Sequence, residues 1–254
     1  MISYLRKIRR QLLSENKFTK YLIYALGEIL LIVIGILIAL AINNANENSK
    51  VRTKEFSYLK NIKNDLIINV QEIDGYINNR EQRIASAKTI LEHFDGKPIE
   101  NLETMIVDIG NIYSWRKFFQ NNNTYQELIN SGNLAIISND SIKNTLLNLE
   151  SLYKKLKDEE SHFRYDSEIL LYAPSYKIID HHSFVENYKY QLSNGQVGTR
   201  LPLIRGQYEL MLEDIEQKNG FAMAVLEFGI MNQQLAAMKN QSEELIKLIE
   251  SEIK

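Results

Sequence analysis

Apolar residues dominate one stretch of the chain, residues 21–42, which reads YLIYALGEILLIVIGILIALAI. A helix of about 22 residues spans the ~30 Å hydrocarbon core of a bilayer, so we predict a transmembrane helix there. The best later candidate, residues 221–238, is interrupted by Glu227 and by Gln233-Gln234. Charged and amide side chains at that spacing favour a buried or amphipathic helix over a second span.

After the apolar run, apolar or small residues recur at heptad spacing along residues 52–94. One row contains Leu59, Leu66, Ile73, Ala87 and Phe94, and a second contains Val70, Ile77, Ile84 and Leu91. This pattern predicts a long helix that continues, or nearly continues, the membrane helix. Arg80 interrupts the first row and Lys63 the second, which favours packing in a bundle over an isolated two-stranded coiled coil. Asp95-Gly96-Lys97-Pro98 is typical of a helix end.

The rest of the chain shows shorter periods and then a second long seam. We predict short helices at residues 98–171, with Asp140 as one N-cap, and a loop-rich segment at residues 172–202, where prolines and glycines interrupt any period. A C-terminal long helix is expected at residues 219–253, antiparallel to the first long helix. Its apolar seam contains Phe221, Phe228, Met231, Leu235, Met238, Leu245 and Ile249.

These patterns together predict an all-α fold. In it, an N-terminal transmembrane helix continues into a long-helix antiparallel bundle, or a coiled-coil-like domain, at residues 43–254.

The charges around the apolar run predict its orientation. Arg6, Lys7, Arg9, Arg10, Lys17 and Lys20 precede it, against one acid, Glu15. Such basic flanks stay on the cytoplasmic side, so we predict a single-pass inner (cytoplasmic) membrane protein with a cytoplasmic N-terminus and a periplasmic C-terminal domain. Four basic residues that follow the run, Lys50, Arg52, Lys54 and Lys60, count toward the opposite orientation.

Two alternatives concern the N-terminal segment. Residues 1–20 place Ile2, Leu5, Ile8 and Leu12 among the bases, which predicts a basic amphipathic tail on the inner leaflet; a disordered topology signal is the alternative. Ala39-Leu40-Ala41 resembles a signal-peptide cleavage site, but the apolar run exceeds the about 7 to 15 residues of a signal h-region. We therefore favour an uncleaved signal-anchor.

Composition excludes several classes of protein. The chain has 24% charged residues, a formal net charge of −2 and a pI of about 6.2, so we predict no nucleic-acid partner. It contains no cysteine, which excludes disulfides, thiolate catalysis and cysteine-ligated metal centres.

Several short sequence motifs of the N-terminal region resemble those of a known family. They are Glu15-Asn16-Lys17-Phe18, Lys20-Tyr21-Leu22, Gly27-Glu28, Gly35-Ile36, Ile38-Ala39, Ile42-Asn43-Asn44 and Asn46-Glu47, with a weaker match from Thr124 to Leu134. In these motifs the chain is similar to an uncharacterised family of bacterial single-span membrane proteins, a domain of unknown function. It departs from that family at Ala45, where a tryptophan is expected. The resemblance implies an envelope protein with a helical domain and brings no activity with it.

One acidic residue, Glu28, lies inside the apolar run, where a carboxylate is costly. Small residues at four-residue spacing beside it allow close approach of a second span. We therefore predict a span-span contact, and with it a homodimer, at Gly27, Glu28, Leu31, Gly35 and Ala39. The alternative places Glu28 at the inner headgroups, with the hydrocarbon segment beginning near Ile29.

Candidate chemistry elsewhere is sparse. His181 and His182 follow Asp180, but adjacent side chains point apart, unlike the i, i+4 pair of a helical zinc site. No nucleophile-elbow, phosphate-loop or zinc-protease motif is present in the sequence, and Trp115 with its neighbours is typical of a core and its rim. We predict no catalytic, cofactor or metal site and no enzymatic activity.

The predicted function is that of a membrane-anchored helical interaction or scaffold protein of the bacterial cell envelope. Its expected partners are the lipid bilayer, a second copy of the chain and an envelope protein of unknown identity. The alternative is an extracytoplasmic ligand-sensing module that acts through a separate signalling protein. An enzyme with dispersed carboxylates and histidines would require a deep polar pocket.

Overall fold

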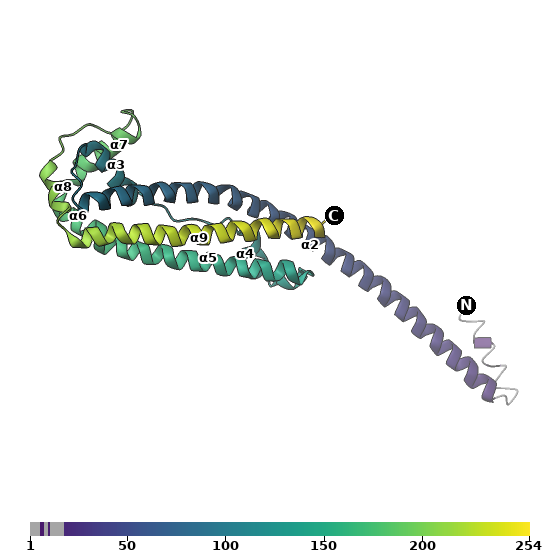
Figure 1. The fold of residues 1–254 in the computed structure, drawn as a ribbon. Helices are drawn as coiled ribbons and strands as arrows, with labels where there is room; N and C mark the ends of the chain where they lie inside the picture. The colour runs from purple at the N-terminus through teal and green to yellow at the C-terminus, as the bar shows by residue number, and fades with distance from the viewer. Residues whose placement is uncertain (1–5, 8–9, 11–17) are drawn as a thin grey trace. The chain divides into compact units, whose positions relative to one another are not determined.

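The computed structural model describes residues 6, 7, 10 and 18–254. The apolar positions of the predicted amphipathic tail, Ile2, Leu5, Ile8 and Leu12, lie outside the described residues. All regular secondary structure in the described residues is helical, which confirms the predicted all-α class (Figure 1). The helices are α2 (Phe18–Phe94), α3 (Leu102–Tyr113), α4 (Asn123–Asn130), the 3₁₀ helix η1 (Asn133–Ile136), α5 (Asp140–Ser167), the π-helix η2 (Glu168–Tyr172), α6 (Ala173–Ile178), α7 (His181–Leu192), α8 (Arg205–Met211) and α9 (Ile215–Glu252).

The chain divides into two compact units, residues 1–57 and residues 58–254. Helix α2 contributes to both units and is continuous from the apolar run into the heptad rows of residues 52–94. In the first unit, the large apolar side chains from Leu22 to Ile42 are 42% to 70% exposed. This part of α2 is long and apolar enough to cross a membrane and is not buried inside the protein. It is a candidate membrane span or signal anchor.

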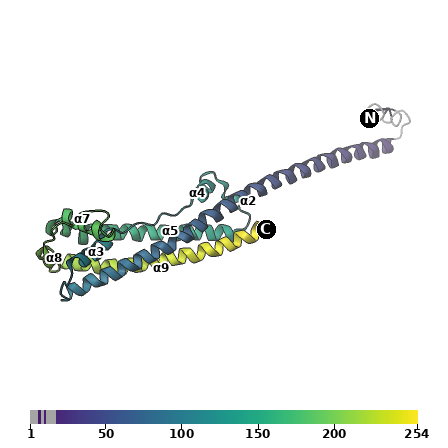
Figure 2. The same ribbon diagram turned by 90° about the horizontal axis from the view of Figure 1, so that it is seen from above.

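The second unit is built on three long helical segments: residues 58–94 of α2, helix α5 and helix α9. Polar contacts between α2 and α9 join Lys63 to Glu250, Asp74 to Lys239 and Asp95 to Lys218. Residue numbers rise along one helix as they fall along the other, so the two run antiparallel, as the two seams predicted (Figure 2). Asn139, before α5, donates to Glu252, near the end of α9, and His162, late in α5, lies 3.9 Å from Glu227, in the first half of α9. Helix α5 is therefore antiparallel to α9 as well.

Helix α5 therefore runs in the same direction as residues 58–94 of α2, and the chain must return between them. It does so through residues 114–122, which we name the return segment (Figure 1). Its two ends are held against α2: Arg83 donates to the carbonyl of Ser114, and Asn69 exchanges two hydrogen bonds with the backbone of Asn121. The return segment thus lines the bundle along several turns of α2.

Capping residues account for where the helices begin. The Asn139 side chain accepts from the backbone N–H groups of Ser141 and Ile142, so Asn139 is the N-cap of α5, and the predicted cap at Asp140 is wrong by one residue. Helix α5 then extends for 28 residues, longer than the short helices predicted there. Asp214 caps α9, which begins at Ile215, a few residues before the predicted start.

The prediction of a loop-rich segment at residues 172–202 is wrong for most of its length. Helices α6 and α7 occupy residues 173–178 and 181–192. Helix α6 follows the π-helix η2 directly, with Tyr172 and Ala173 in the right-handed helical region, so Pro174 lies in a continuous helical run, just after the π-helix ends. The Asp180 side chain caps α7.

An aromatic cluster forms one part of the core of the second unit. Trp115, at the start of the return segment, contacts Phe163 of α5 and Phe228 of α9, with ring centroids 5.1 and 6.3 Å away. Trp115 is 5% exposed, which places it in the core as its neighbours predicted. Phe119 is 69% exposed and lies at the rim.

Candidate functional site

The predicted span-span contact lies on one helix, α2, at Gly27, Glu28, Leu31, Gly35 and Ala39. Glu28 is half-buried and the other four are exposed. A Cβ atom added at Gly27 or Gly35 would meet no atom within 4 Å, so the surface beside both glycines is open. The contact with a second span stays a prediction.

A buried polar cluster joins α2, the return segment and α5. Arg80 Nη2 lies 2.6 Å from Glu160 Oε1, and the same carboxylate oxygen accepts from the backbone N–H of Phe118 at 2.7 Å. Lys157 Nζ donates to Glu160 Oε2 at 3.1 Å and to the Phe118 carbonyl at 3.2 Å. Burial lowers the pKa of Arg80, and the charge of Glu160 opposes that shift. Arg80, which interrupts the first heptad row, therefore forms an internal ion pair with Glu160, and Glu160 in turn fixes the return segment.

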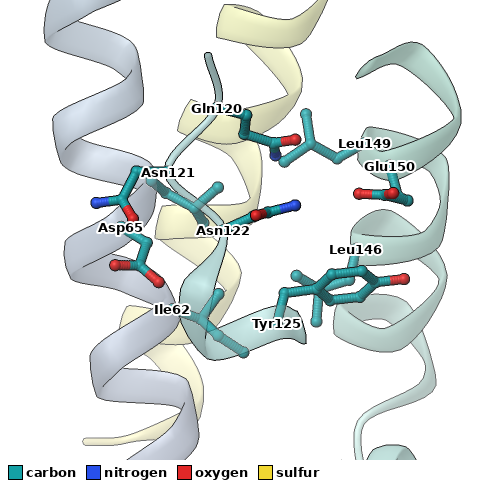
Figure 3. Close-up of a pocket in the computed structure, with 10 residues that line it drawn as sticks. Ile62, Asp65, Gln120, Asn121, Asn122, Tyr125, Leu146, Leu149 and Glu150 are labelled. Atoms are coloured by element: carbon teal, nitrogen blue, oxygen red, sulfur yellow. The ribbon is translucent and has the colours of Figure 1, made fainter. Parts of the chain in front are cut away.

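A small cavity lies elsewhere in the second unit, where Ile62 and Leu66 of α2 face Leu146 and Leu149 of α5 (Figure 3). It is bounded by α2, the return segment, α4 and α5, and its volume is about 20 Å³. Gln120 Oε1 and Glu150 Oε2, from two of its walls, are buried without a hydrogen-bond partner. A space of that size holds about one water molecule, and water supplies the hydrogen-bond donors that these two oxygens lack. The cavity is too small for a substrate or a cofactor.

A larger cavity, of about 830 Å³, lies between α2, the end of α3 and α7. We name it the cationic cavity because Arg83 and Arg116 both line it. Its other walls carry the neutral polar residues Asn79, Gln82, Asn111, Ser114 and Tyr188, the ring of Tyr76, the apolar Leu192, and Gly75 and Glu72.

Arg83 is held rigidly at this cavity and is only 7% exposed. Its Nε donates to Asn79 Oδ1 at 2.8 Å, its Nη1 to Ser114 Oγ at 3.3 Å and its Nη2 to the Ser114 carbonyl at 3.1 Å. In the part of the chain that the structure describes, no carboxylate lies within ion-pair distance of Arg83 or Arg116. Burial lowers the pKa of Arg83, and the charges of Arg116 and Arg80 lower it further.

A chain of hydrogen bonds continues from Ser114, which Arg83 contacts, to Tyr188 and the residues of α3. The Ser114 and Tyr188 hydroxyls are 2.9 Å apart, and Tyr188 donates to Asn111 Oδ1 at 3.3 Å. Asn111 donates in turn to Ser86 at 3.0 Å, and Ser86 donates to Asp108 at 2.7 Å. Burial raises the pKa of Asp108, against the opposing hydrogen bond from Ser86. Sequence reasoning missed this site because its residues come from three helices and the return segment and form no motif.

The two histidines considered for metal binding, His181 and His182, differ in burial. His182 is exposed, whereas His181 is half-buried with its Nε2 3.1 Å from Ser175 Oγ. Within the described residues there is no group of three or more histidines or carboxylates that could hold a metal ion. Burial lowers the pKa of His181. Ser175 is fully buried and also donates to the Tyr172 carbonyl, so this serine-histidine pair is closed to a substrate.

Comparisons with known proteins place the chain in a family without assigning an activity. A family model described as a family of unknown function (DUF6090) matches residues 28–170, more than half of the chain. The match covers the buried ion pair, the return segment and both arginines of the cationic cavity. Searches found no match among curated proteins and none among solved structures. As the sequence predicted, the chain belongs to an uncharacterised family, the family of unknown function DUF6090.

Proposed function

We propose that this chain is a single-span membrane protein whose helical domain serves as an interaction or scaffold module of the bacterial cell envelope. The exposed apolar surface of α2 from Leu22 to Ile42 carries the proposal. Apolar surface gains roughly 25 cal/mol for each Å² that leaves water, so a continuous run of exposed isoleucine and leucine favours insertion into lipid. The basic residues that precede the run favour a cytoplasmic N-terminus and an exported domain.

The packing of residues 58–254 supports the interaction role. The return segment and the buried ion pair hold three long helical segments in one arrangement. A preorganised surface loses little conformational freedom when it binds, which favours recognition of a partner. Apolar side chains are exposed on different elements of this unit, among them Phe119, Tyr165 and Leu226.

Location is tested with single cysteines, because the chain has none of its own. Ser251 is exposed at the end of α9, whereas Ser242 is buried on the same helix. In intact cells, a membrane-impermeant thiol reagent should label Ser251→Cys at full length and leave Ser14→Cys unlabelled. Ser242→Cys, the matched control, should react only after denaturation. Labelling of Ser14→Cys alone would overturn the proposed orientation.

The interaction role is tested by photocrosslinking in cells. A photoreactive phenylalanine derivative placed singly at Phe119, Tyr165 and Leu226 samples the return segment, α5 and α9. A discrete crosslinked product from at least one position, absent when the derivative is placed at buried Phe163, supports a protein partner. Absence of product at all three exposed positions counts against this role.

The cationic cavity favours a second function, binding of a small ligand by an extracytoplasmic sensor. Its volume is in the range of about 300 to 1,000 Å³ that is typical of small-molecule sites. A sensor of this kind would act through a separate signalling protein.

A further inference from the structure

We propose that the cationic cavity binds the carboxylate or phosphate group of a small organic anion between Arg83 and Arg116. This inference deepens the second function, because it names the ligand class of that site. It is independent of the interaction role and of the orientation in the membrane.

The charge of Arg83 is the first argument. Arg80 and Arg83 lie one helical turn apart on α2 and are both buried, at 2% and 7% exposed. Arg80 has Glu160 at 2.6 Å, whereas Arg83 contacts only the neutral side chains of Asn79 and Ser114 and one carbonyl. A buried charge is normally paired with an opposite charge. Of these two arginines, Arg80 has such a counter-ion and Arg83 lacks one among the described residues.

The structural role of Arg83 does not account for its whole charge. Ser114, whose carbonyl it binds, is the C-cap residue of α3. The end of a helix carries roughly half a negative charge, which offsets part of one guanidinium. Arg116 adds a second positive charge to the same cavity without a carboxylate of its own among the described residues. An anion placed between the two relieves their repulsion.

The donors at the cavity match an oxyanion. A guanidinium has five N–H groups, and Arg83 uses three in its hydrogen bonds, so two remain for a ligand. Guanidinium groups bind carboxylate and phosphate oxygens with paired, charge-assisted hydrogen bonds. Ordered neutral groups, the Tyr188 hydroxyl and the Asn111 amide, line the same cavity.

The remaining walls indicate an organic body on the anion. The ring of Tyr76 and the side chain of Leu192 line the cavity beside the amides of Asn79 and Gln82. Glu72, the acid in the lining, is exposed and suits a ligand that also carries hydrogen-bond donors. A small carboxylic acid or phosphate ester combines these features.

The test uses the full chain in nanodiscs of neutral lipid, with the melting temperature measured against succinate or inorganic phosphate at constant ionic strength. A ligand that binds only the folded state raises the melting temperature in a saturable way. We expect such a rise for at least one probe, and an apparent affinity at least tenfold weaker in Arg116→Gln. Lys88→Gln removes an exposed charge from α2 outside the cavity and should leave the affinity unchanged.

Arg116 is exposed, so its substitution leaves the fold intact and the result interpretable even if Arg83→Gln fails to fold. A response to succinate alone assigns a carboxylate, and a response to phosphate alone assigns a phosphate ester. Absence of a saturable rise with both probes would overturn the proposal, as would equal weakening in Arg116→Gln and Lys88→Gln. Neither result changes the outcome of the labelling or crosslinking experiments.

Discussion

Arg80 of α2 and Glu160 of α5 form an ion pair with 2.6 Å between Nη2 and Oε1, and their side chains are 2% and 0% exposed. The same carboxylate also binds the backbone N–H of Phe118 in the return segment. One acidic side chain thereby joins three segments that are far apart in the chain. The parallel arrangement of α5 with residues 58–94 of α2 depends on this return path.

Removing Glu160 should destabilise the bundle strongly. Glu160→Gln leaves Arg80 buried without a counter-ion, and breaking a buried pair in this way costs about 3 to 5 kcal/mol. Denaturant unfolding of the full chain in detergent measures the loss. Asp158→Asn, at an exposed position of the same helix, should change stability by less than about 0.5 kcal/mol. A loss as small as that of the control would show that the pair does not hold the return segment.

The double variant Arg80→Met, Glu160→Leu should recover most of the stability, since neither charge is then buried alone.

Gly110 of α3 allows close packing against α7. A Cβ atom there would lie 2.3 Å from the ring of Tyr188, whose hydroxyl belongs to the wall of the cationic cavity. Because an aromatic ring cannot bend away, Gly110→Ala should destabilise the fold by roughly 1 to 3 kcal/mol. Gly229, in α9, has open space around its Cβ position, so Gly229→Ala should be neutral or stabilising by about 0.4 to 1 kcal/mol. Equal melting temperatures for the two variants would contradict this account.

Glu227 should make stability depend on pH. Its side chain is 5% exposed and its Oε2 is buried without a hydrogen-bond partner. Burial, followed by the charge of Glu159, raises the pKa of Glu227, and His162 opposes the shift. The folded state therefore holds this proton more tightly than the unfolded state. The free energy of unfolding falls as the pH rises from the ordinary glutamate pKa of about 4.3 through the folded value.

Glu227→Gln should accordingly be more stable than the unmodified chain at pH 7, by about 1.4 kcal/mol for each unit of pKa difference, and should lose this advantage near pH 4. Unfolding midpoints measured from pH 4 to pH 8 test the trend. Glu244→Gln, which removes an exposed acid from the same helix, serves as the control. A constant difference between Glu227→Gln and the unmodified chain across this range would exclude the titration of Glu227 as its cause.

Self-association of the span should depend on Gly35. Replacing it by isoleucine places a branched side chain on the stripe of small residues and should weaken association in a membrane reporter assay several-fold. Val33→Ile enlarges a side chain on another side of the same helix and should leave the signal unchanged. An unaltered signal in Gly35→Ile would exclude this face as the contact between spans.

The sequence determined the features that depend on near neighbours in the chain. The apolar run, the heptad rows of residues 52–94 and the C-terminal seam specify long helices because a helix repeats its burial pattern every three to four residues. The same locality explains the errors. Asn139 and Asp180 are caps whose effect depends on one or two backbone N–H groups. Pro174 is a residue that ordinarily interrupts a helix, yet the helical backbone continues through it from η2 into α6.

Only the tertiary structure decided how the polar residues are used. In the sequence, Arg80 only interrupts a row of apolar residues. In the structure it forms an ion pair with Glu160, eighty residues later. The cationic cavity combines Arg83, Arg116 and Tyr188 from separate elements, and no spacing in the chain marks them as neighbours. Burial and charge pairing arise between segments that are distant in sequence, because helix packing creates the low-dielectric surroundings in which they act.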